Sequence, residues 1–398
     1  MGAALLLRSI GRLFTAGRAG TIDAAAVVVR DGLIAYAGPE ASLPAELGIT
    51  EEVDLGGALV TPGLIDAHTH PLYGGNRFAE IALRSSGASY AEIAAAGGGI
   101  ASTVTATRAT SADRLAADAR ERLRSWLAGG TTTVETKTGY LLDESGESEA
   151  VRILAGLGGD PALPSLEVTW LAGHGVGPEF AGDADGYIEA ACQWCEGARA
   201  AGARHADVFC DEGYFTVEQS RRLLRAAAGA GMLPRIHADE LARTGGARLA
   251  AELNCSSADH LLCVQEDDAR ALAGAGVVAT LAPVTALAMG RRPPVRTLLD
   301  AGVTIALGSD HNPGTCGTTS MSFVVALGVA ELGLSVAASL TAATAGGAAS
   351  LRRADRGRVE AGLRADLVAW KADHEGAFAW SYGLRPLRVF KAEPIPTV

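Results

Sequence analysis

Short apolar segments that alternate with longer amphipathic segments are the feature of this sequence that most restricts its fold. The segments 111–130 and 216–231 have helical periodicity, and Thr216 followed by Glu218 is typical of a helix N-terminus. Eight strands alternating with helices predict an α/β fold, a (β/α)8 barrel of the TIM type. The segments with the length and composition of buried strands are 59–68, 131–136, 166–173, 205–210, 232–238, 256–261, 276–282 and 303–309.

The two ends of the chain follow a different pattern. The N-terminal segment contains short apolar bursts, and Arg30-Asp31-Gly32 between two such runs indicates a hairpin. Residues 357–373 again predict strand, turn and strand. Neither end can bury its apolar face alone, so we expect the two ends to combine. The predicted domains are a small β-sandwich of residues 1–57 and 355–398 and a catalytic barrel of residues 58–354.

Charge and cysteine content narrow the class of protein. The net charge of the 398-residue chain is −11, which argues against nucleic acid or an anionic membrane as partner because both attract basic surfaces. A small anionic substrate stays compatible, since one arginine can set the local field. The six cysteines are widely spaced, and Cys192 and Cys195 lie in a predicted helix where packing explains them. With no signal-peptide pattern and no long apolar run, we expect a cytoplasmic protein.

Histidines gather where the predicted strands end. The segment ALVTPGLIDAHTH ends on His68 and His70, which point the same way because side chains alternate along a strand. His237 closes MLPRIH, and Asp310 closes VTIALGSD. Catalytic groups of such barrels gather at these strand ends. We therefore expect these four residues to bind one divalent metal ion, zinc or iron, whose bound water supplies a hydroxide nucleophile.

Two further residues lie near the predicted metal ligands. Glu240 follows His237 by three residues and could take the proton from the attacking water, although an exposed glutamate opening a helix would give the same pattern. His260 could polarise the carbonyl group under attack, or it could be a core histidine bonded to Asp259. The residues alone leave both alternatives open.

Motifs along the whole chain carry a resemblance to a known enzyme family. They are PGLIDAHTH, GNRFAEIALRSSGASYAEIAAAGGGIASTVTATR (75–108), ETKTGY (135–140), ADVFCDEGYF (206–215), HADE, SADH, SDHNPGTCGTTSM (309–321) and ATAGGAASLRRADRGRVEAGLRADL (343–367). Together they resemble the imidazolonepropionases of the amidohydrolase superfamily. The HxH motif marks only the superfamily, whereas the NRF, SY and AGGGI block with SDxNPGT is much more specific.

The resemblance implies a reaction and a set of roles. Imidazolonepropionases open the ring of 4-imidazolone-5-propanoate to N-formimino-L-glutamate in histidine degradation, and a homodimer is the implied assembly. By position, the implied metal ligands are His68, His70, His237 and Asp310. The implied catalytic residues are Glu240, which takes the proton from water, His260, which lies beside the substrate carbonyl, and Asp310. The implied substrate-binding residues are Arg77, Tyr90, Tyr140, His174, Asn312, Gly314 and Thr315.

A lysine and an arginine refine this picture. In two-metal relatives a modified lysine from the fourth barrel strand bridges the ions, whereas Lys137 closes the second predicted strand, so we expect a single ion. Arg77 follows the metal strand, where its planar fork suits both oxygens of a propionate carboxylate. An ordinary surface arginine is the alternative.

Three departures from the family pattern concern the substrate. His311 stands where an uncharged residue is usual, the segment 141–149 differs from the usual continuation, and 281–290 lacks an expected aromatic residue. These changes leave open a sister amidohydrolase that acts on another cyclic amide or amidine, such as a hydantoin-like ring, or that deaminates a heterocycle. A metal-binding scaffold without activity is the alternative from another class, and Glu240 and His260 argue against it.

Overall fold

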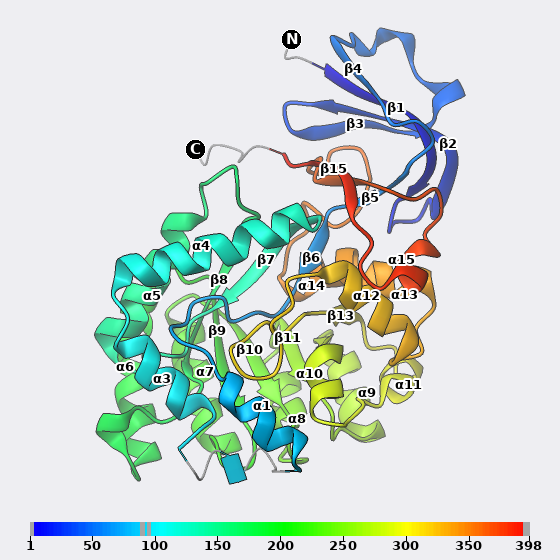
Figure 1. The fold of residues 1–398 in the computed structure, drawn as a ribbon. Coiled ribbons are helices and arrows are strands. Elements are labelled where there is room, and N and C mark those ends of the chain that lie inside the picture. Colours follow the sequence, from blue (N-terminus) through cyan, green and yellow to red (C-terminus); the bar gives the residue numbers. More distant parts are fainter. Residues whose placement is uncertain (1–3, 88–91, 94–96, 393–398) are drawn as a thin grey trace.

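The computed structural model describes residues 4–87, 92–93 and 97–392, and the strands among them form two sheets (Figure 1). One is an eight-stranded parallel sheet in the order β13-β12-β11-β10-β9-β8-β7-β6. The other has seven strands in the order β15-β14-β5-β1-β2-β3, with β4 beside β1. The predicted α/β class with a parallel barrel is confirmed, and strands from both chain ends share the second sheet.

The barrel strands correspond to the eight predicted segments. Most of their residues are buried, as expected for a parallel sheet covered by helices. The strands are β6 (Leu64–Asp66), β7 (Thr131–Lys137), β8 (Ser165–Gly173), β9 (His205–Cys210), β10 (Leu233–Ala238), β11 (Ser257–His260), β12 (Val278–Leu281) and β13 (Ile305–Leu307).

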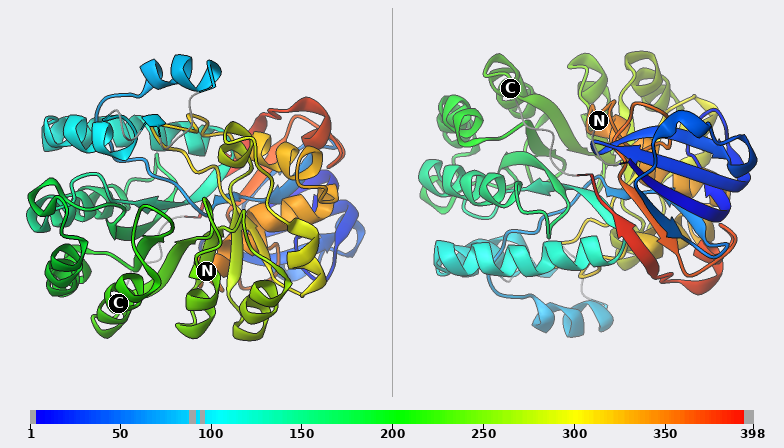
Figure 2. Two further views of the ribbon diagram at one scale, coloured as in Figure 1. Left: turned by 90° about the horizontal axis from the view of Figure 1, so that it is seen from below. Right: turned by 90° about the horizontal axis from the view of Figure 1, so that it is seen from above.

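Helices surround these strands as an outer ring when the molecule is seen along the barrel (Figure 2). The predicted helix start at Thr216 is confirmed, because its hydroxyl accepts from the backbone N–H of Gln219 in a capping box. Within the described residues, no helix has the length and apolar character needed to span a bilayer. The helices are α1 (Phe78–Ser85), α3 (Ile100–Arg108), α4 (Ala112–Ala128), α5 (Glu144–Leu157), α6 (Ala184–Ala201), α7 (Val217–Gly229), α8 (Gly246–Glu252), α9 (Glu266–Ala275), α10 (Pro283–Ala288), α11 (Val295–Asp300), α12 (Met321–Ala330), α13 (Val336–Thr341), α14 (Gly347–Ser350) and α15 (Ala377–Ser381).

The terminal sheet lies at the opposite end of the molecule from α1 (Figure 1). The hairpin predicted at Arg30-Asp31-Gly32 is confirmed. Arg30 pairs with Leu33, and the two turn residues Asp31 and Gly32 have positive φ, 50° and 73°, as a tight two-residue turn requires. The strands of this sheet are β1 (Ala4–Phe14), β2 (Thr21–Arg30), β3 (Leu33–Pro39), β4 (Glu51–Asp54), β5 (Leu59–Pro62), β14 (Leu367–Trp370) and β15 (Pro386–Phe390).

Two strand predictions were wrong in detail. The segment 59–68 divides at Gly63, so that β5 joins the terminal sheet and β6 the barrel. The backbone of Gly63 lies so close to Thr132 that a Cβ on this glycine would be 2.1 Å from the threonine Oγ1. The strand, turn and strand predicted over 357–373 contain only β14. Apart from an isolated bridge between Arg364 and Leu33, 357–366 consists of turns and irregular backbone, and β14 pairs with β15 and β5.

Irregular backbone closes the barrel between β13 and β6. The N–H of Ala67 donates to the carbonyl of Leu307 at 3.3 Å, and the N–H of Asp310 donates to the carbonyl of His68 at 2.9 Å. The N–H of His70 then donates to the carbonyl of His311 at 2.8 Å. The seam of the barrel therefore holds three of the predicted metal ligands.

Packing behind this seam yields a stability prediction. Gly346 ends a π-helical turn (Ala342–Gly346), and a Cβ there would lie 2.1 Å from the carbonyl oxygen of Ile305. Gly346→Ala should lower the free energy of unfolding by about 1–3 kcal/mol, because two backbones must separate. Gly274→Ala, in the exposed part of α9 with nothing near its Cβ, should raise it by about 0.5–1 kcal/mol. Urea unfolding of both variants measures the difference, and equal effects would contradict this explanation.

Candidate active site

Imidazole rings and one carboxylate converge at the carboxyl ends of the barrel strands. The Nε2 atoms of His68 and His70 are 3.3 Å apart, and they lie 3.5 and 3.4 Å from Oδ1 of Asp310. Possible ligand atoms form two groups, and within each group all the atoms lie within 4.8 Å of one another. The first group is His68, His70 and His237, and the second is His68, His260 and Asp310. The structure thus brings together all four predicted metal ligands, with His260 beside them.

The protonation of these rings fits a bound cation. Burial is the largest cause that lowers the pKa of His68 and His70 well below its usual value, so both are neutral near pH 7. Nδ1 of His68 lies 2.7 Å from Oδ2 of Asp259, which leaves Nε2 with its lone pair toward the cluster. Nδ1 of the buried His237 lies 3.1 Å from Oδ2 of Asp207, whereas its Nε2 makes no hydrogen bond within the described part of the chain. A buried nitrogen without a partner is energetically unfavourable, and a metal ion would satisfy it.

Asp259 forms a hydrogen bond with His68 and not with His260, the histidine considered from the sequence. It accepts from His68, Arg235 and Ser257, whereas Nδ1 of His260 lies 3.5 Å from Oε1 of Glu240. The alternative of a core histidine bonded to Asp259 is therefore wrong. Adjacent residues of a strand point to opposite sides, so this pairing was unfavourable from the start.

A group of buried charges lies behind the histidines. Nζ of Lys137 donates to Asp207 at 2.7 Å and to Glu135 at 2.9 Å, and it lies 3.5 Å from Asp259. Burial alone would lower the pKa of Lys137, but Asp207 and Glu135 outweigh it and the pKa is raised, so the ammonium stays charged. Sequence analysis missed this group. Charged residues inside the predicted strands could have revealed it, because such residues are rarely buried unless they are paired.

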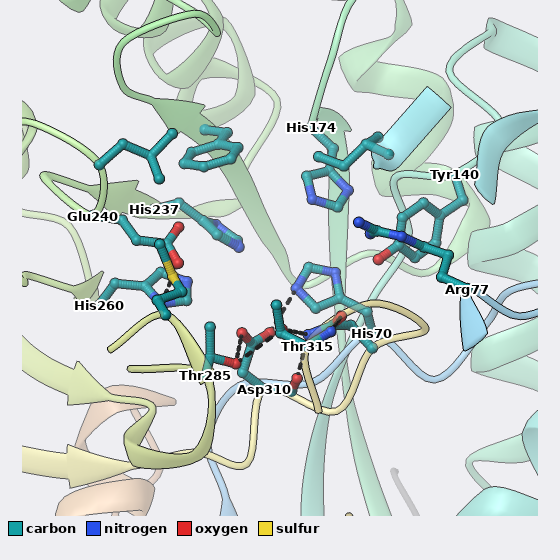
Figure 3. Close-up of a pocket in the computed structure, with 15 residues that line it drawn as sticks. His70, Arg77, Tyr140, His174, His237, Glu240, His260, Thr285, Asp310 and Thr315 are labelled. Carbon is teal, nitrogen blue, oxygen red and sulfur yellow. Dashed lines mark hydrogen bonds and ion pairs between the residues drawn. The ribbon is translucent and has the colours of Figure 1, made fainter. Parts of the chain in front are cut away.

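Glu240 is buried and points into the pocket (Figure 3). The carboxylate of Asp211 accepts from the backbone N–H groups of Glu240, Leu241 and Ala242 at 2.7, 2.8 and 3.0 Å, which fixes this loop after β10. The alternative of an exposed glutamate at a helix start is wrong, since α8 begins only at Gly246. Burial, and then the charge of Asp310, raise the pKa of Glu240 well above its usual value. Such a carboxylate can hold a proton near neutral pH.

His260 and Asp310 have strained backbone conformations. Their φ values are 73° and 52°, in the left-handed region that residues other than glycine rarely adopt. The hydroxyl of Thr285 donates to Oδ2 of Asp310 at 2.6 Å and so directs the other oxygen toward the histidines. Burial lowers the pKa of His260 to about 4, which keeps the ring neutral. No motif in the sequence indicated Thr285, because its contact joins α10 to the loop after β13.

Three predicted substrate-binding residues line the opposite wall of the pocket (Figure 3). Nε and Nη2 of Arg77 donate to Oε2 of Glu80 at 2.9 and 2.7 Å, so the guanidinium is buried and oriented. This contradicts the alternative of a surface arginine. Nδ1 of His174 donates to the carbonyl of Gly139 at 3.0 Å, which leaves Nε2 as an acceptor in the neutral ring. The ring of Tyr140 lies 5.0 Å from that of His174.

The loop after Asp310 borders both walls. Oδ1 of Asn312 accepts from the N–H groups of Gly314 and Thr315 at 2.8 and 2.9 Å, and this turn shapes the loop. Asn312 and Thr315 line the pocket. Gly314 leaves room for Arg77, since a Cβ there would lie 2.4 Å from Nη1 of the arginine. Tyr90 lies outside the described residues.

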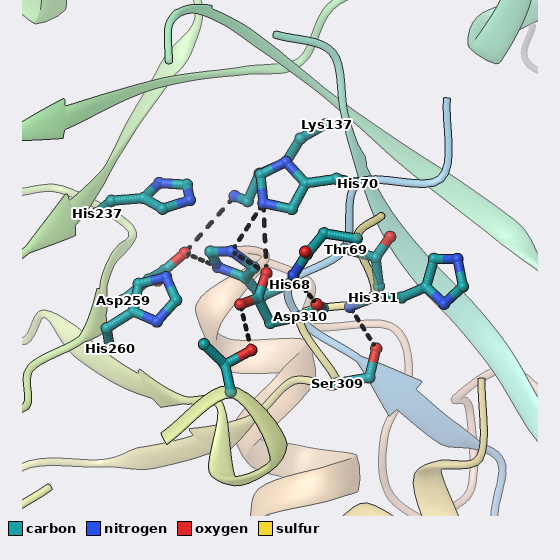
Figure 4. Close-up of polar contacts among 12 residues, drawn as sticks. His68, Thr69, His70, Lys137, His237, Asp259, His260, Ser309, Asp310 and His311 are labelled. Atoms are coloured by element: carbon teal, nitrogen blue, oxygen red, sulfur yellow. Dashed lines mark hydrogen bonds and ion pairs between the residues drawn. The ribbon is translucent and has the colours of Figure 1, made fainter. Parts of the chain in front are cut away.

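The three departures from the family pattern can also be placed. Nε2 of His311 lies 3.3 Å from the hydroxyl of Tyr73, and its ring is turned away from the histidine cluster (Figure 4). His311 does not line the pocket described above. Segment 141–149 supplies Glu147, whose carboxylate accepts from three N–H groups of the loop around Tyr140. Segment 281–290 contributes Thr285 and Met289 to the pocket wall.

Comparisons with known proteins agree with this geometry. A family model described as the amidohydrolase family matches residues 216–392. The imidazolonepropionase of Anaeromyxobacter sp. (strain K) is 43% identical over 368 residues, which cover 91% of this chain and 87% of that protein. The imidazolonepropionase of Porphyromonas gingivalis (strain ATCC BAA-308 / W83) is 41% identical over 374 residues, with 92% and 88% covered. The chain belongs to the imidazolonepropionase family. A solved triazine hydrolase from Arthobacter aurescens shares the fold, with a TM-score of 0.77 at 20% identity over 98% of this chain and 94% of that one.

The contact of Thr285 with Asp310 leads to a prediction about this imidazolonepropionase-family site. Thr285→Val keeps the shape but removes the hydroxyl, so a bound divalent ion should be held about tenfold more weakly, the usual scale for an outer hydrogen bond to a ligand. Competition with a chelator measures the affinity. Thr280→Val is the matched control, because its buried hydroxyl makes no hydrogen bond within the described residues. Equal ion affinity in both variants would refute the role of Thr285.

Proposed function

We propose that this chain hydrolyses the ring of 4-imidazolone-5-propanoate to N-formimino-L-glutamate in histidine degradation. The observation that carries the proposal is a single pocket with two unlike walls. Glu240 and His260 lie beside the candidate metal ligands, and Arg77, with Tyr140 and His174, faces them. One wall thus carries residues suited to hydrolysis and the other an arginine suited to binding a carboxylate. This combination suits a substrate that is a cyclic amide with a flexible propionate. Membership of the imidazolonepropionase family supports the same reaction.

We propose one divalent ion per chain, zinc or iron, held by His68, His70, His237 and Asp310. Support comes from the neutral rings of His68 and His70, from Nε2 of His237, which has no hydrogen-bond partner in the described part of the chain, and from the common space that these ligand atoms face. When bound, such an ion polarises a carbonyl oxygen and lowers the pKa of a bound water.

The protein side chains would handle the proton. Glu240, with its raised pKa, would accept a proton from water as the water oxygen bonds to the ring carbonyl carbon. The carbon–nitrogen bond then breaks, and Glu240 would return the proton to the departing nitrogen. The neutral ring of His260 would lie beside the carbonyl oxygen. Arg77 would hold the propionate at the far wall, where Glu80 already fixes its orientation.

We also propose that the enzyme works in the cytoplasm as a homodimer. The six cysteines, which all lie in the described part of the chain, are free thiols, as expected in a reducing compartment. The dimer follows from the family resemblance alone, and sedimentation of the purified protein would measure it.

The direct test is a turnover assay on freshly prepared imidazolone propionate, followed by ultraviolet absorbance, with a hydantoin as the comparison ring. Turnover of the propionate substrate should disappear after chelation and return with zinc or iron. Faster hydrolysis of the neutral hydantoin would overturn the proposal and favour a sister amidohydrolase.

Glu240→Gln tests the proposed base. The amide keeps the shape but cannot accept a proton, so turnover should fall by at least about a hundredfold, the usual contribution of a general base. Metal content should stay at the wild-type level, which separates this effect from loss of the ion. Turnover close to that of the wild type would assign the proton transfer to another group.

Arg77→Met tests recognition of the carboxylate. Removing one partner of a buried charge pair should lower kcat/KM for imidazolone propionate by an amount equivalent to about 2–5 kcal/mol of activation free energy. Hydrolysis of a neutral ring should change little. Arg84→Met is the control, because Arg84 lies on the same helix but donates to the carbonyl of Gly314. A similar loss for both rings would mean that Arg77 acts on the fold and not on the carboxylate.

A further inference from the structure

Lys137 is a fully buried ammonium that the proposed reaction does not use. Three carboxylates surround its Nζ: Oδ2 of Asp207 at 2.7 Å, Oε1 of Glu135 at 2.9 Å and Oδ2 of Asp259 at 3.5 Å. All four side chains have no solvent exposure. We call these three acids the carboxylate cage. Buried charges persist only when they are paired, so the cage needs a cation inside it.

Two atoms of the cage also contact candidate metal ligands. Oδ2 of Asp259 lies 2.7 Å from Nδ1 of His68, and Oδ2 of Asp207 lies 3.1 Å from Nδ1 of His237. Lys137 therefore holds the same oxygen atoms that orient two of the histidines. Figure 4 shows the half of this arrangement in which Asp259 lies between Lys137 and His68. Orientation of a ligand histidine by an outer carboxylate affects the affinity for the metal.

Arg235 cannot replace Lys137 in this position. Its Nη1 and Nη2 donate to the backbone carbonyls of Ser350 and Ala67, and only Nη2 also reaches Asp259, at 3.2 Å. Its Nε lies 3.8 Å from Glu135. Lys137, by contrast, lies within 3.5 Å of all three acids.

We propose that Lys137 is a positioning residue that acts as a built-in counter-cation and limits the active site to one divalent ion. Three converging carboxylate oxygens are ligands that hard divalent cations prefer, and the ammonium occupies the place such an ion would take. This inference rests on the proposed function, since it takes the adjacent histidine cluster to be the first metal site.

The test counts ions in variants at position 137. Lys137→Ala opens the cage, and Lys137→Gln removes the charge but keeps most of the volume, so that a folded variant is available if alanine is not tolerated. Lys137→Arg keeps the charge as the matched control. Each protein is dialysed against Zn²⁺ or Mn²⁺, the ions per chain are counted by mass spectrometry, and thermal unfolding is followed with and without the ion.

Wild type and Lys137→Arg should bind one ion. The alanine and glutamine variants should bind a second ion, at least tenfold tighter than any second ion on the wild type, and that ion should raise their unfolding temperature. Adding Glu135→Gln to Lys137→Ala should weaken the second ion, because one cage ligand is lost. A residue that only fills space would not change the ion count.

Different results would overturn the two proposals separately. One ion per chain in both neutral variants, with the affinity of the wild type, would refute the role of Lys137. Two ions in Lys137→Arg would refute it as well. A wild-type protein that binds no ion at all would instead refute the proposed metal site, whatever the variants do.

Discussion

The backbone seam between β13 and β6 is the constraint on which the site depends. A parallel barrel must pair its first strand with its last, and here the pairing passes through the N–H groups of Ala67, His70 and Asp310. Of these, His70 and Asp310 carry candidate ligand atoms on their side chains, and the carbonyl of His68, a third candidate, accepts from Asp310. Closure of the barrel and assembly of the metal site are therefore one structural event, and strain at Asp310, with φ at 52°, accompanies it.

Charge compensation behind the seam sets the second condition. The rings of His68 and His70 are neutral, and the acids around Lys137 would repel one another without cations in contact with them. Lys137 and Arg235 supply those cations from β7 and β10, both with no solvent exposure. Because ionic groups in a barrel interior cannot be screened by water, their geometry is more demanding than that of a surface pair. The site thus depends on residues that never touch the substrate.

Sequence reasoning succeeded where local pattern and chemistry agree. The strand ends, the HxH spacing, and the Asp31-Gly32 turn are short-range signals, and the structure has all of them. It was wrong for 357–373, where two turn glycines lie between apolar residues that resemble a strand. It left open whether His260 bonds to Asp259, and it did not foresee the contact of Asp259 with His68, because these two residues are 191 positions apart.

The sequence by itself determined the alternation of strands and helices, the histidines at strand exits and the family to which the chain belongs. Those properties depend on residue type and spacing, which can be read along one dimension. Only the tertiary structure decided that Asp259 supports His68, that Thr285 directs Asp310, and that Lys137 lies among three carboxylates. Apart from the contact of Lys137 with Glu135 on β7, these contacts join different elements of the fold, and closure of the barrel brings them within hydrogen-bond distance.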